Sequence, residues 1–180
     1  MEIIKTCLDG CFILKPKVFK DERGAFFESF HKITFEKLTG MQIDFVQDNQ
    51  SVSFKGTVRG LHFQTGKYAQ AKLVRVIEGE VLDVAVDIRP TSTTYGKHIA
   101  VILNHNNNNQ LFVPRGFAHG FITLSEKVIL GYKCDNYYNK DYESGIFYDD
   151  PELNIDWKLD NSEIILSKKD RKLKFFNDLF

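Results

Sequence analysis

The sequence predicts an all-β fold, a sandwich or barrel of the jelly-roll kind. Many short runs are rich in Val, Ile, Phe and Tyr and are separated by Gly, Asn, Asp or Pro, as strands joined by turns are. Helical periodicity is scarce along the chain. A chain of 180 residues that is 43% hydrophobic can bury a core, and its length fits one domain, which we expect to span residues 1–180.

Nine segments predict the strands of this fold. Each is short, apolar or alternating, and bounded by residues that favour turns. In chain order they cover residues 10–19, 23–30, 44–54, 57–63, 71–88, 98–104, 110–116, 119–125 and 128–134. The run "NHNNNNQ" at 104–110 separates two of these segments and predicts a loop.

The segment 71–88 is long enough for two strands. The run "EGE" at 78–80 predicts a hairpin turn between them. In the second strand, apolar and acidic residues alternate, which predicts an antiparallel strand with one buried face. The apolar face carries Leu82, Val84, Val86 and Ile88, and the polar face carries Asp83 and Asp87.

Two segments have helical character. The run "HKITFEKLTG" at 31–40 predicts one helix that ends at Gly40. The run "SKKDRKLKFFNDLF" at 167–180 predicts either a helix or an irregular tail.

Charge and cysteine content exclude several classes of protein. Lys and Arg number 24, and Asp and Glu also number 24, so no overall field attracts nucleic acid or an anionic membrane. Cys7, Cys11 and Cys134 are odd in number and lack CxxC spacing, which favours free thiols in a reducing cytosol. The sequence contains no secretory signal and no apolar run near the roughly 20 residues of a membrane helix. We expect a soluble, cytoplasmic protein that binds neither nucleic acid nor membrane.

Polar residues interrupt several apolar strands, and these residues are the candidates for chemistry. Each has an ordinary structural explanation on its own, such as a hydrogen-bonded core histidine or a solvated lysine. Together they predict a shared polar cavity at the mouth of a small barrel. The residues are Arg59, His62, Lys72, His119 and Tyr132.

The stretch "VRGLHFQ" at 58–64 raises a geometric question. Arg59 and His62 are three residues apart, so in a regular strand they would face opposite sides. Gly60 lies between them and allows a β-bulge that brings both side chains to one side. We therefore expect a bulge at Gly60.

Metal-binding barrels of the cupin type are similar in pattern, and they hold the ion with an HxH pair, a following Glu and a later His. Here Gln64 stands at the position of the second His, and no Glu lies between Gln64 and Lys72. The later histidine is present as His119 in "PRGFAHGF". Two imidazoles beside a lysine make a poor site for a divalent ion, so we expect no metal and histidines that are free for acid–base work.

Six segments together resemble one family. They are "FKDERGAFFESF" at 19–30, "FVQDNQSVSFKGTVRGLHFQ" at 45–64, "QAKLVRVIEGEVLDVAVDIRPTSTTYGKH" at 70–98, "LFVPRGFAHGFITLS" at 111–125, "YKCDNYY" at 132–138 and "IILSKKDRKL" at 164–173. In order and over nearly the whole chain, they are similar to the dTDP-4-dehydrorhamnose 3,5-epimerases. The resemblance implies a cupin-type jelly roll and inversion of the two carbons that flank a ketone in a nucleotide-linked 4-keto-6-deoxy sugar.

The resemblance also implies four catalytic residues. His62 is the base that removes a proton next to the ketone, and Asp170 orients it. Without the family resemblance, the sequence alone would favour Asp170 as one charge in the solvated run "KKDRKLK". Lys72 stabilises the enolate oxygen, and Tyr132 returns a proton to the opposite face of the sugar.

Ten further residues are implied as contacts to the nucleotide sugar: Arg23, Glu28, Gln47, Asp48, Asn49, Arg59, His119, Tyr138, Glu143 and Lys168. Arg23 and Arg59 suit the diphosphate, and Tyr138 suits stacking on thymine. The family is a homodimer that exchanges N-terminal strands, so Arg23 and Glu28 would serve the neighbouring subunit. The resemblance implies no metal and no cofactor.

Two alternatives to this function stay open. The first is a single-carbon epimerase that acts on another nucleotide-linked 4-keto-6-deoxy sugar. The second is a cupin protein that binds a sugar nucleotide, or a metal, without catalysis. The presence of both a base and an acid candidate counts against binding alone.

Overall fold

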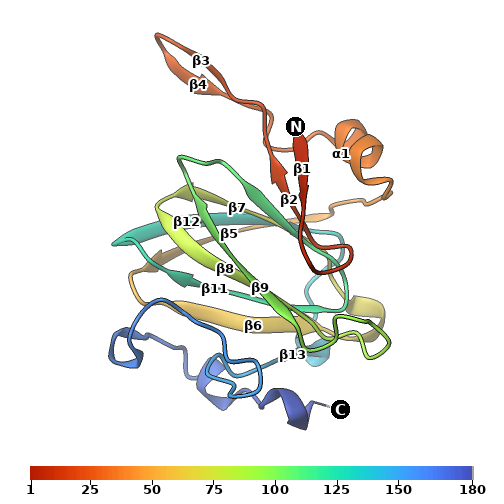
Figure 1. Cartoon of the computed structure of the whole chain (residues 1–180), viewed down its shortest axis with the longest axis vertical. Coiled ribbons are helices and arrows are strands. Elements are labelled where there is room, and N and C mark those ends of the chain that lie inside the picture. Colours follow the sequence, from red (N-terminus) through yellow and green to blue (C-terminus); the bar gives the residue numbers. More distant parts are fainter. Residues whose placement is uncertain (180) are drawn as a thin grey trace.

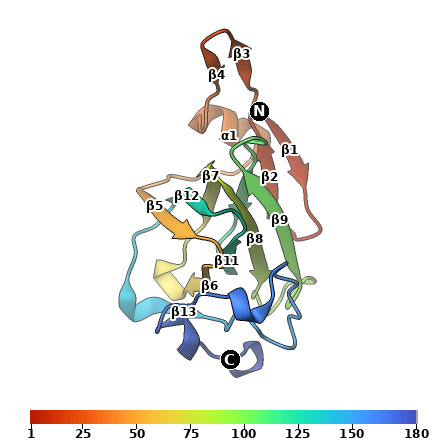
Figure 2. The same cartoon turned by 90° about the vertical axis from the view of Figure 1, so that its left-hand side faces the viewer.

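The computed structural model describes residues 1–179 and places two antiparallel β-sheets face to face, as Figures 1 and 2 show. The six-stranded sheet has the order β1 (Glu2–Lys5), β2 (Phe12–Lys15), β10 (Gln110–Val113), β7 (Lys72–Glu78), β12 (Lys127–Cys134) and β5 (Gln47–Phe54). The five-stranded sheet has the order β13 (Glu143–Gly145), β6 (Val58–Gln64), β11 (Phe117–Thr123), β8 (Glu80–Asp87) and β9 (His98–Asn104). The molecule is the all-β jelly roll that the sequence predicts.

All nine predicted segments contain strand, and the asparagine-rich run forms the loop between β9 and β10. Strands β3 (Phe19–Asp21) and β4 (Gly24–Phe26) form a separate two-stranded hairpin, which projects away from the two large sheets (Figure 1). The short strands β1 and β13 lie outside the predicted segments, and β3 lies outside them except for Phe19.

The predicted helix is α1 (Lys32–Thr39). His31 caps it because its side chain accepts a hydrogen bond from the backbone N–H of Thr34, at 3.3 Å. Gly40 ends it in the left-handed conformation, with φ of 70°. Within residues 1–179, no helix combines the length and the apolar character needed to cross a membrane.

The "EGE" turn joins the two sheets, and the prediction of a hairpin was wrong. Strand β7 pairs with β10 and β12, whereas β8 pairs with β9 and β11. Gly79 makes this transfer possible because its φ is 86° and a Cβ atom there would lie 2.2 Å from the carbonyl oxygen of Lys127. Short-range alternation predicts a strand but does not reveal its partner.

Strand β8 is buried on both faces, so the prediction of one exposed face was also wrong. Leu82, Val84 and Val86 face outward into an apolar cluster with Trp157 and other residues of the C-terminal segment. The opposite face points between the two sheets, where Asp83 and Asp87 are fully buried. Each carboxylate is compensated there by a basic side chain.

Three apolar clusters stabilise the layers. One lies between the sheets and includes Val74, Val81 and Leu130. A second lies on the outer face of the six-stranded sheet, where Phe35 of α1 packs within 5.5 Å of the Phe112 ring, measured between centroids. The third lies under the C-terminal segment, on the outer face of the five-stranded sheet.

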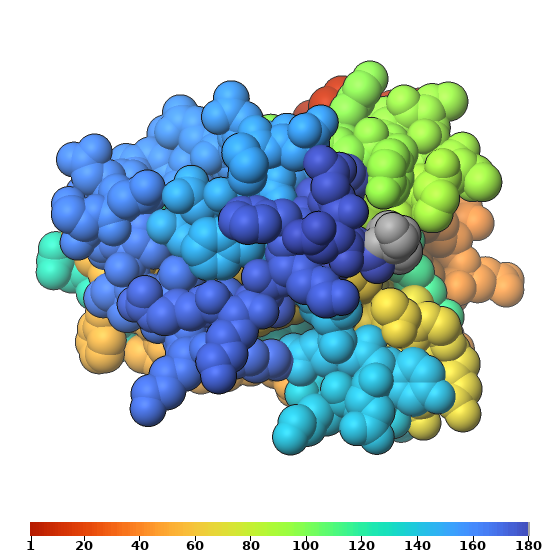
Figure 3. Space-filling view, turned by 90° about the horizontal axis from the view of Figure 1, so that it is seen from below, coloured from red at the N-terminus to blue at the C-terminus, as the bar shows by residue number. Residues whose placement is uncertain are grey.

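The C-terminal segment from residue 150 onward is irregular, which is one of the two predicted possibilities. It contains the short 3₁₀ turns η3 (Asn161–Glu163), η4 (Asp170–Lys172) and η5 (Phe176–Asp178). Two other turns, η1 (Gly66–Tyr68) and η2 (Lys140–Tyr142), lie in loops. Figure 3 shows the segment, in blue, spread over one face of the molecule.

Two parallel bridges hold this segment against the five-stranded sheet on either side of η4. They pair Thr57 with Ile165 and Ile146 with Lys174. Beyond the second bridge, the buried carboxylate of Asp150 accepts a hydrogen bond from the backbone N–H of Phe176, at 2.6 Å. The backbone of η4 is therefore fixed at both ends.

Candidate active site

A bulge in β6 brings Arg59 and His62 to the same side of the sheet. His62 pairs with His119 of β11, and Arg59 pairs with Phe121. Strand β6 advances three residues between these pairs, whereas β11 advances two. The extra residue restores the inward direction that regular alternation would have reversed. The predicted bulge is confirmed.

Gly60 is the residue at which the two strands approach most closely. Its φ is 129°, and a Cβ atom there would lie 2.5 Å from the Cα of Gly120 on β11. The peptide bond from Gly60 to Leu61 is cis. Only glycine fits this position without displacing the backbone.

Two polar cavities meet between the sheets. One has a volume of about 300 Å³ and is lined by Arg59, His119 and Asp170 among others. The other has a volume of about 250 Å³ and opens toward β5, β13 and the loop after β12. Three side chains line both cavities, namely those of His62, Lys72 and Tyr132. The predicted base, cation and acid therefore surround one space.

His62 and Asp170 form a hydrogen-bonded pair, with His62 Nε2 at 2.7 Å from Asp170 Oδ1. The histidine side chain is 27% exposed and the aspartate 5%. Burial alone would raise the pKa of Asp170, but the hydrogen bond and charge of His62 lower it below its usual value. The carboxylate is thus ionised, and it favours the tautomer in which the other ring nitrogen, Nδ1, can accept a proton.

Lys72 brings its ammonium group to the junction of the two cavities from β7. Burial lowers its pKa, while the nearby Cys134, Asp83 and Glu143 act in the opposite direction. A charge in this poorly hydrated space acts more strongly on a ligand than it would in water.

Tyr132 approaches the same space from β12. Burial is the main cause that raises the pKa of its phenol, and Cys134 adds to the effect. The phenol therefore holds its proton at neutral pH and is available as a donor. His62 and Tyr132 belong to different sheets, so they reach a bound molecule from two sides.

A second histidine–carboxylate pair lies beside the first. His119 Nε2 lies 2.7 Å from Asp83 Oδ1, and the two side chains are 7% and 0% exposed. Asp83 was not predicted as a site residue. The alternation in β8 shows that Asp83 and Asp87 share one face of the strand, but it does not show that this face lies inside the barrel.

The second cavity carries the predicted nucleotide contacts. Gln47 accepts a hydrogen bond from the backbone N–H of Tyr138 at 3.0 Å and donates one to Asn49 at 3.0 Å. The hydroxyl of Tyr138 donates to Glu143 at 2.7 Å, and Lys169 pairs with the same carboxylate. Burial alone would raise the pKa of Glu143, but these two partners lower it.

Four predicted residues lie outside both cavities. Arg23 and Glu28 are exposed and belong to or follow the projecting hairpin, where Arg23 bonds to Asp21. Asp48 points to the outer face of the six-stranded sheet and pairs with Lys133 at 2.8 Å. Lys168 is exposed beside the cavity rather than in its lining.

Sequence reasoning also missed residues that line the cavities. Lys169, next to the predicted Lys168, is the lysine of this segment that reaches the cavity and Glu143. Ser167 orders the same turn because its hydroxyl accepts a hydrogen bond from the backbone N–H of Asp170 at 3.0 Å. An irregular segment has no periodicity that could have predicted these directions.

The positions at which cupins bind metal do not fit an ion here. Gln64 uses its amide to donate to the carbonyls of Tyr68 and Tyr137 and to accept from the N–H of Asn139. His62 and His119 each direct Nε2 to a carboxylate. Among residues 1–179, no three His, Cys, Asp or Glu side chains form a group that could hold a metal ion.

A jelly roll with a histidine–aspartate pair and a tyrosine on facing sheets, around a partly buried lysine, has the architecture and side chains of the cupin-type sugar epimerases. The family model described as dTDP-4-dehydrorhamnose 3,5-epimerase matches residues 5–178. This chain belongs to that family.

Individual relatives agree with this assignment. The dTDP-4-dehydrorhamnose 3,5-epimerase of Methanothermobacter thermautotrophicus is 51% identical over 172 residues, which cover 95% of this chain and 92% of that protein. The crystal structure of the enzyme from Elizabethkingia anophelis has a TM-score of 0.96 and 51% identity, over 99% of this chain and 98% of that one. A second solved structure is that of dTDP-6-deoxy-D-glucose-3,5-epimerase from Legionella pneumophila in complex with dTDP-4-keto-L-rhamnose. It has a TM-score of 0.96 and 47% identity, and the match covers 99% of this chain and 94% of that one.

Proposed function

We propose that this chain, as one epimerase domain over residues 1–180, converts dTDP-4-keto-6-deoxy-D-glucose to dTDP-4-keto-L-rhamnose. Family membership and the complex that the Legionella pneumophila relative forms with dTDP-4-keto-L-rhamnose support this substrate. The observation that carries the proposal is the convergence of His62, Lys72 and Tyr132 on one polar space between the sheets.

In the proposed reaction, His62 removes a proton from a carbon next to the ketone. The imidazolium that forms is stabilised by Asp170, at 2.7 Å. General-base catalysis of this kind contributes about 10²- to 10⁴-fold to the rate. The electrons of the broken C–H bond move into the enolate, whose oxygen is stabilised by the Lys72 ammonium.

Tyr132 then donates its phenolic proton to the opposite face of the same carbon, which inverts it. The buried phenol suits this role because burial raises its pKa and keeps the proton in place. Water restores the proton on Tyr132 and accepts the proton from His62 before the second carbon reacts. The reaction exchanges protons only, so neither a redox cofactor nor a metal takes part in the proposal.

The thymidine of the nucleotide is assigned to the second cavity. Tyr138, which is 53% exposed and is held by Glu143 and Gln47, offers a fixed aromatic face for thymine. Arg59 lines the other cavity beside His119, and its guanidinium, fixed by a hydrogen bond to Ser53 at 3.0 Å, offers donors to the diphosphate.

We assign Arg23 and Glu28 to the site of a second copy of the chain. Both are exposed on or beside the projecting β3–β4 hairpin, whose Phe19 and Phe26 are also exposed. The free edge of β5, with exposed Val52 and Phe54, provides an uncovered surface for a second copy. A homodimer that exchanges hairpins would cover this surface and complete both sites.

The function is tested by proton NMR of dTDP-4-keto-6-deoxyglucose with the protein in deuterated water. We expect deuterium at both carbons beside the ketone and formation of the inverted product. His62→Ala should abolish exchange, and the exposed His105→Ala is the matched control that should keep it. Tyr132→Phe should keep exchange but lower product formation by about 10²-fold or more.

Two results would contradict the proposal. Deuterium at one carbon only would identify a single-carbon epimerase. No exchange, in a protein that still binds dTDP, would identify a nucleotide-binding protein or an enzyme for a different sugar.

A further inference from the structure

One buried carboxylate beside the cavity has no role in the reaction described above. Asp83 lies on the inner face of β8 and is fully buried. Its Oδ1 atom is bonded to His119 Nε2 at 2.7 Å. Its Oδ2 atom is also buried, and within residues 1–179 it has no hydrogen-bond partner. Burying an ionised carboxylate with one oxygen uncompensated is costly, so its retention needs an explanation.

The second group that Asp83 affects is Lys72. Asp83 is one of the charges that counteract the effect of burial on the Lys72 ammonium. Lys72 and His119 line the same cavity from opposite sheets. Asp83 thus contacts one of the nitrogen groups that face a bound molecule and acts electrostatically on a second.

The other acids near these groups already have partners or are neutral. Asp170 is bonded to His62, and Glu143 is bonded to Tyr138 and Lys169. Burial raises the pKa of the Cys134 thiol to about 11, so this thiol is uncharged at neutral pH. Within residues 1–179, Asp83 is therefore the carboxylate beside the cavity whose unbonded oxygen is also buried from solvent.

We propose that Asp83 is a positioning residue of the epimerisation site. It fixes His119 as the tautomer with hydrogen on Nε2, which leaves Nδ1 as the ring nitrogen available to a bound sugar nucleotide. Its negative charge also keeps the Lys72 ammonium protonated where that ammonium meets the enolate. The consequence for turnover rests on the proposed function, whereas the tautomer of His119 does not.

The first test is the pH profile of turnover for Asp83→Asn, with Asp87→Asn as the matched control. Both aspartates are fully buried on the same face of β8, but Asp87 bonds to Arg89 away from the cavity. Removing the charge of Asp83 should lower kcat/KM by about 10²-fold and move the alkaline limb to lower pH, because Lys72 loses its proton more easily.

The charged and titratable groups that face Lys72 and His119 make this shift specific. They are Arg59, His62, Tyr132, Cys134, Tyr138, Glu143, Lys169 and Asp170. Loss of the phenolic proton of Tyr132 would also end activity at high pH, but Asp83 is not among the charges that shift the pKa of Tyr132. Asp87→Asn should lower stability without moving the alkaline limb. Equal shifts in the two variants, or an unchanged profile in Asp83→Asn, would overturn the proposal.

The second test needs neither a variant nor a substrate. Nitrogen NMR of histidine-labelled protein should show His119 with hydrogen on Nε2 and a bare Nδ1 at pH 8. A mixture of tautomers, or hydrogen on Nδ1 alone, would refute the positioning role even if the enzyme epimerises the sugar. If the sugar is not turned over and His119 still has the expected tautomer, then only the proposed function fails.

Discussion

His62 Nε2 lies 2.7 Å from Asp170 Oδ1, and the two residues are 108 positions apart in the sequence. Strand β6 supplies the histidine, and the irregular C-terminal segment supplies the carboxylate. The bridges at Thr57 and Ile146 fix that segment on both sides of Asp170. The Asp170 carboxylate, which orients the imidazole of His62, therefore belongs to a segment without long regular structure. Contacts with distant strands hold it in place.

Asp170→Asn should lower kcat by about 10³- to 10⁴-fold, as expected when a histidine base loses the carboxylate that orients it. The isosteric amide preserves the shape of the turn, so the free energy of unfolding should change by about 1 kcal/mol or less. Turnover and urea unfolding measured on the same preparation check both numbers. The exposed Asp178→Asn, in the next turn of the segment, is the control that should leave kcat unchanged. Full activity of Asp170→Asn would remove this aspartate from the mechanism.

Gly60→Ala should destabilise the protein by about 3 kcal/mol and reduce activity, because its Cβ would meet the backbone of Gly120 at 2.5 Å. Gly24→Ala is a close control, since Gly24 has φ of 128° and no atom within 4 Å of its Cβ position. The control carries the same backbone strain, about 1–2 kcal/mol, without the crowding. Thermal unfolding of the two variants separates the contributions. Equal losses would show that the close approach of β6 and β11 is not limiting.

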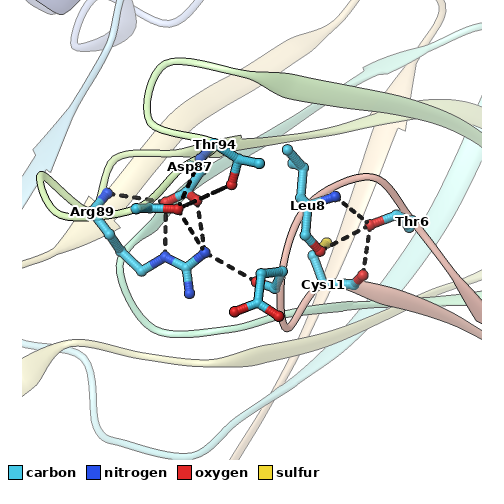
Figure 4. Close-up of polar contacts among 8 residues, drawn as sticks. Thr6, Leu8, Cys11, Asp87, Arg89 and Thr94 are labelled. Carbon is cyan, nitrogen blue, oxygen red and sulfur yellow. Dashed lines mark hydrogen bonds and ion pairs between the residues drawn. The ribbon is translucent and has the colours of Figure 1, made fainter.

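The carboxylate of Asp87 should make stability depend on acid pH. Figure 4 shows it beside Arg89 and Thr94, near the Thr6–Cys11 loop, where Arg89 also donates to the carbonyl of Asp9 at 3.0 Å. Burial alone would raise the pKa of Asp87, but hydrogen bonds from Arg89, Ser92 and Thr94 lower it well below its usual range. A lowered pKa in the folded state contributes stability above the unfolded pKa of about 3.9, and that contribution is lost as the pH falls below it.

Asp87→Asn should therefore cost about 3 kcal/mol at pH 7 and less at pH 3, where the wild-type carboxylate begins to lose its advantage. Urea unfolding at pH 7, 4 and 3 measures this difference. The exposed Asp141→Asn is the control and should follow the wild type at each pH. A cost that is the same at pH 7 and pH 3 would assign the effect to packing rather than charge.

Arg23 is expected to act in the site of a second subunit. Light scattering should give twice the chain mass of 20.8 kDa, and Arg23→Ala should raise KM by about tenfold or more through loss of a charged contact. Lys20→Ala, on the same hairpin, is the charge-matched control that should keep the wild-type KM.

Mixed dimers test the exchange directly. Arg23→Ala and His62→Ala protomers, unfolded and refolded together and assayed well below the wild-type KM, should recover about a quarter of wild-type activity if each hairpin completes its partner's site. In that case one site of each mixed dimer has both residues intact. If Arg23 acts within its own chain, both sites of every mixed dimer are damaged, and the mixture should be no more active than the Arg23→Ala protein alone.

The sequence by itself determined most of the strands, the helix with its end at Gly40, and the polar residues that interrupt apolar runs. These features depend on local alternation and on backbone preferences, which neighbouring residues fix. Even the bulge at Gly60 could be predicted, because two functional side chains three residues apart require an extra residue between them. The family resemblance added Asp170, which local pattern alone would have assigned to solvent.

Only the tertiary structure decided which faces are covered and which strands pair. The alternation in β8 separates Asp83 and Asp87 from the valines, but it does not show that the C-terminal segment covers the valines and that the aspartates lie inside the barrel. In the same way, Lys169 lines the cavity and Lys168 does not, because distant strands hold the irregular segment in one orientation. Local periodicity records which residues share a face, whereas burial depends on contacts between residues far apart in the chain.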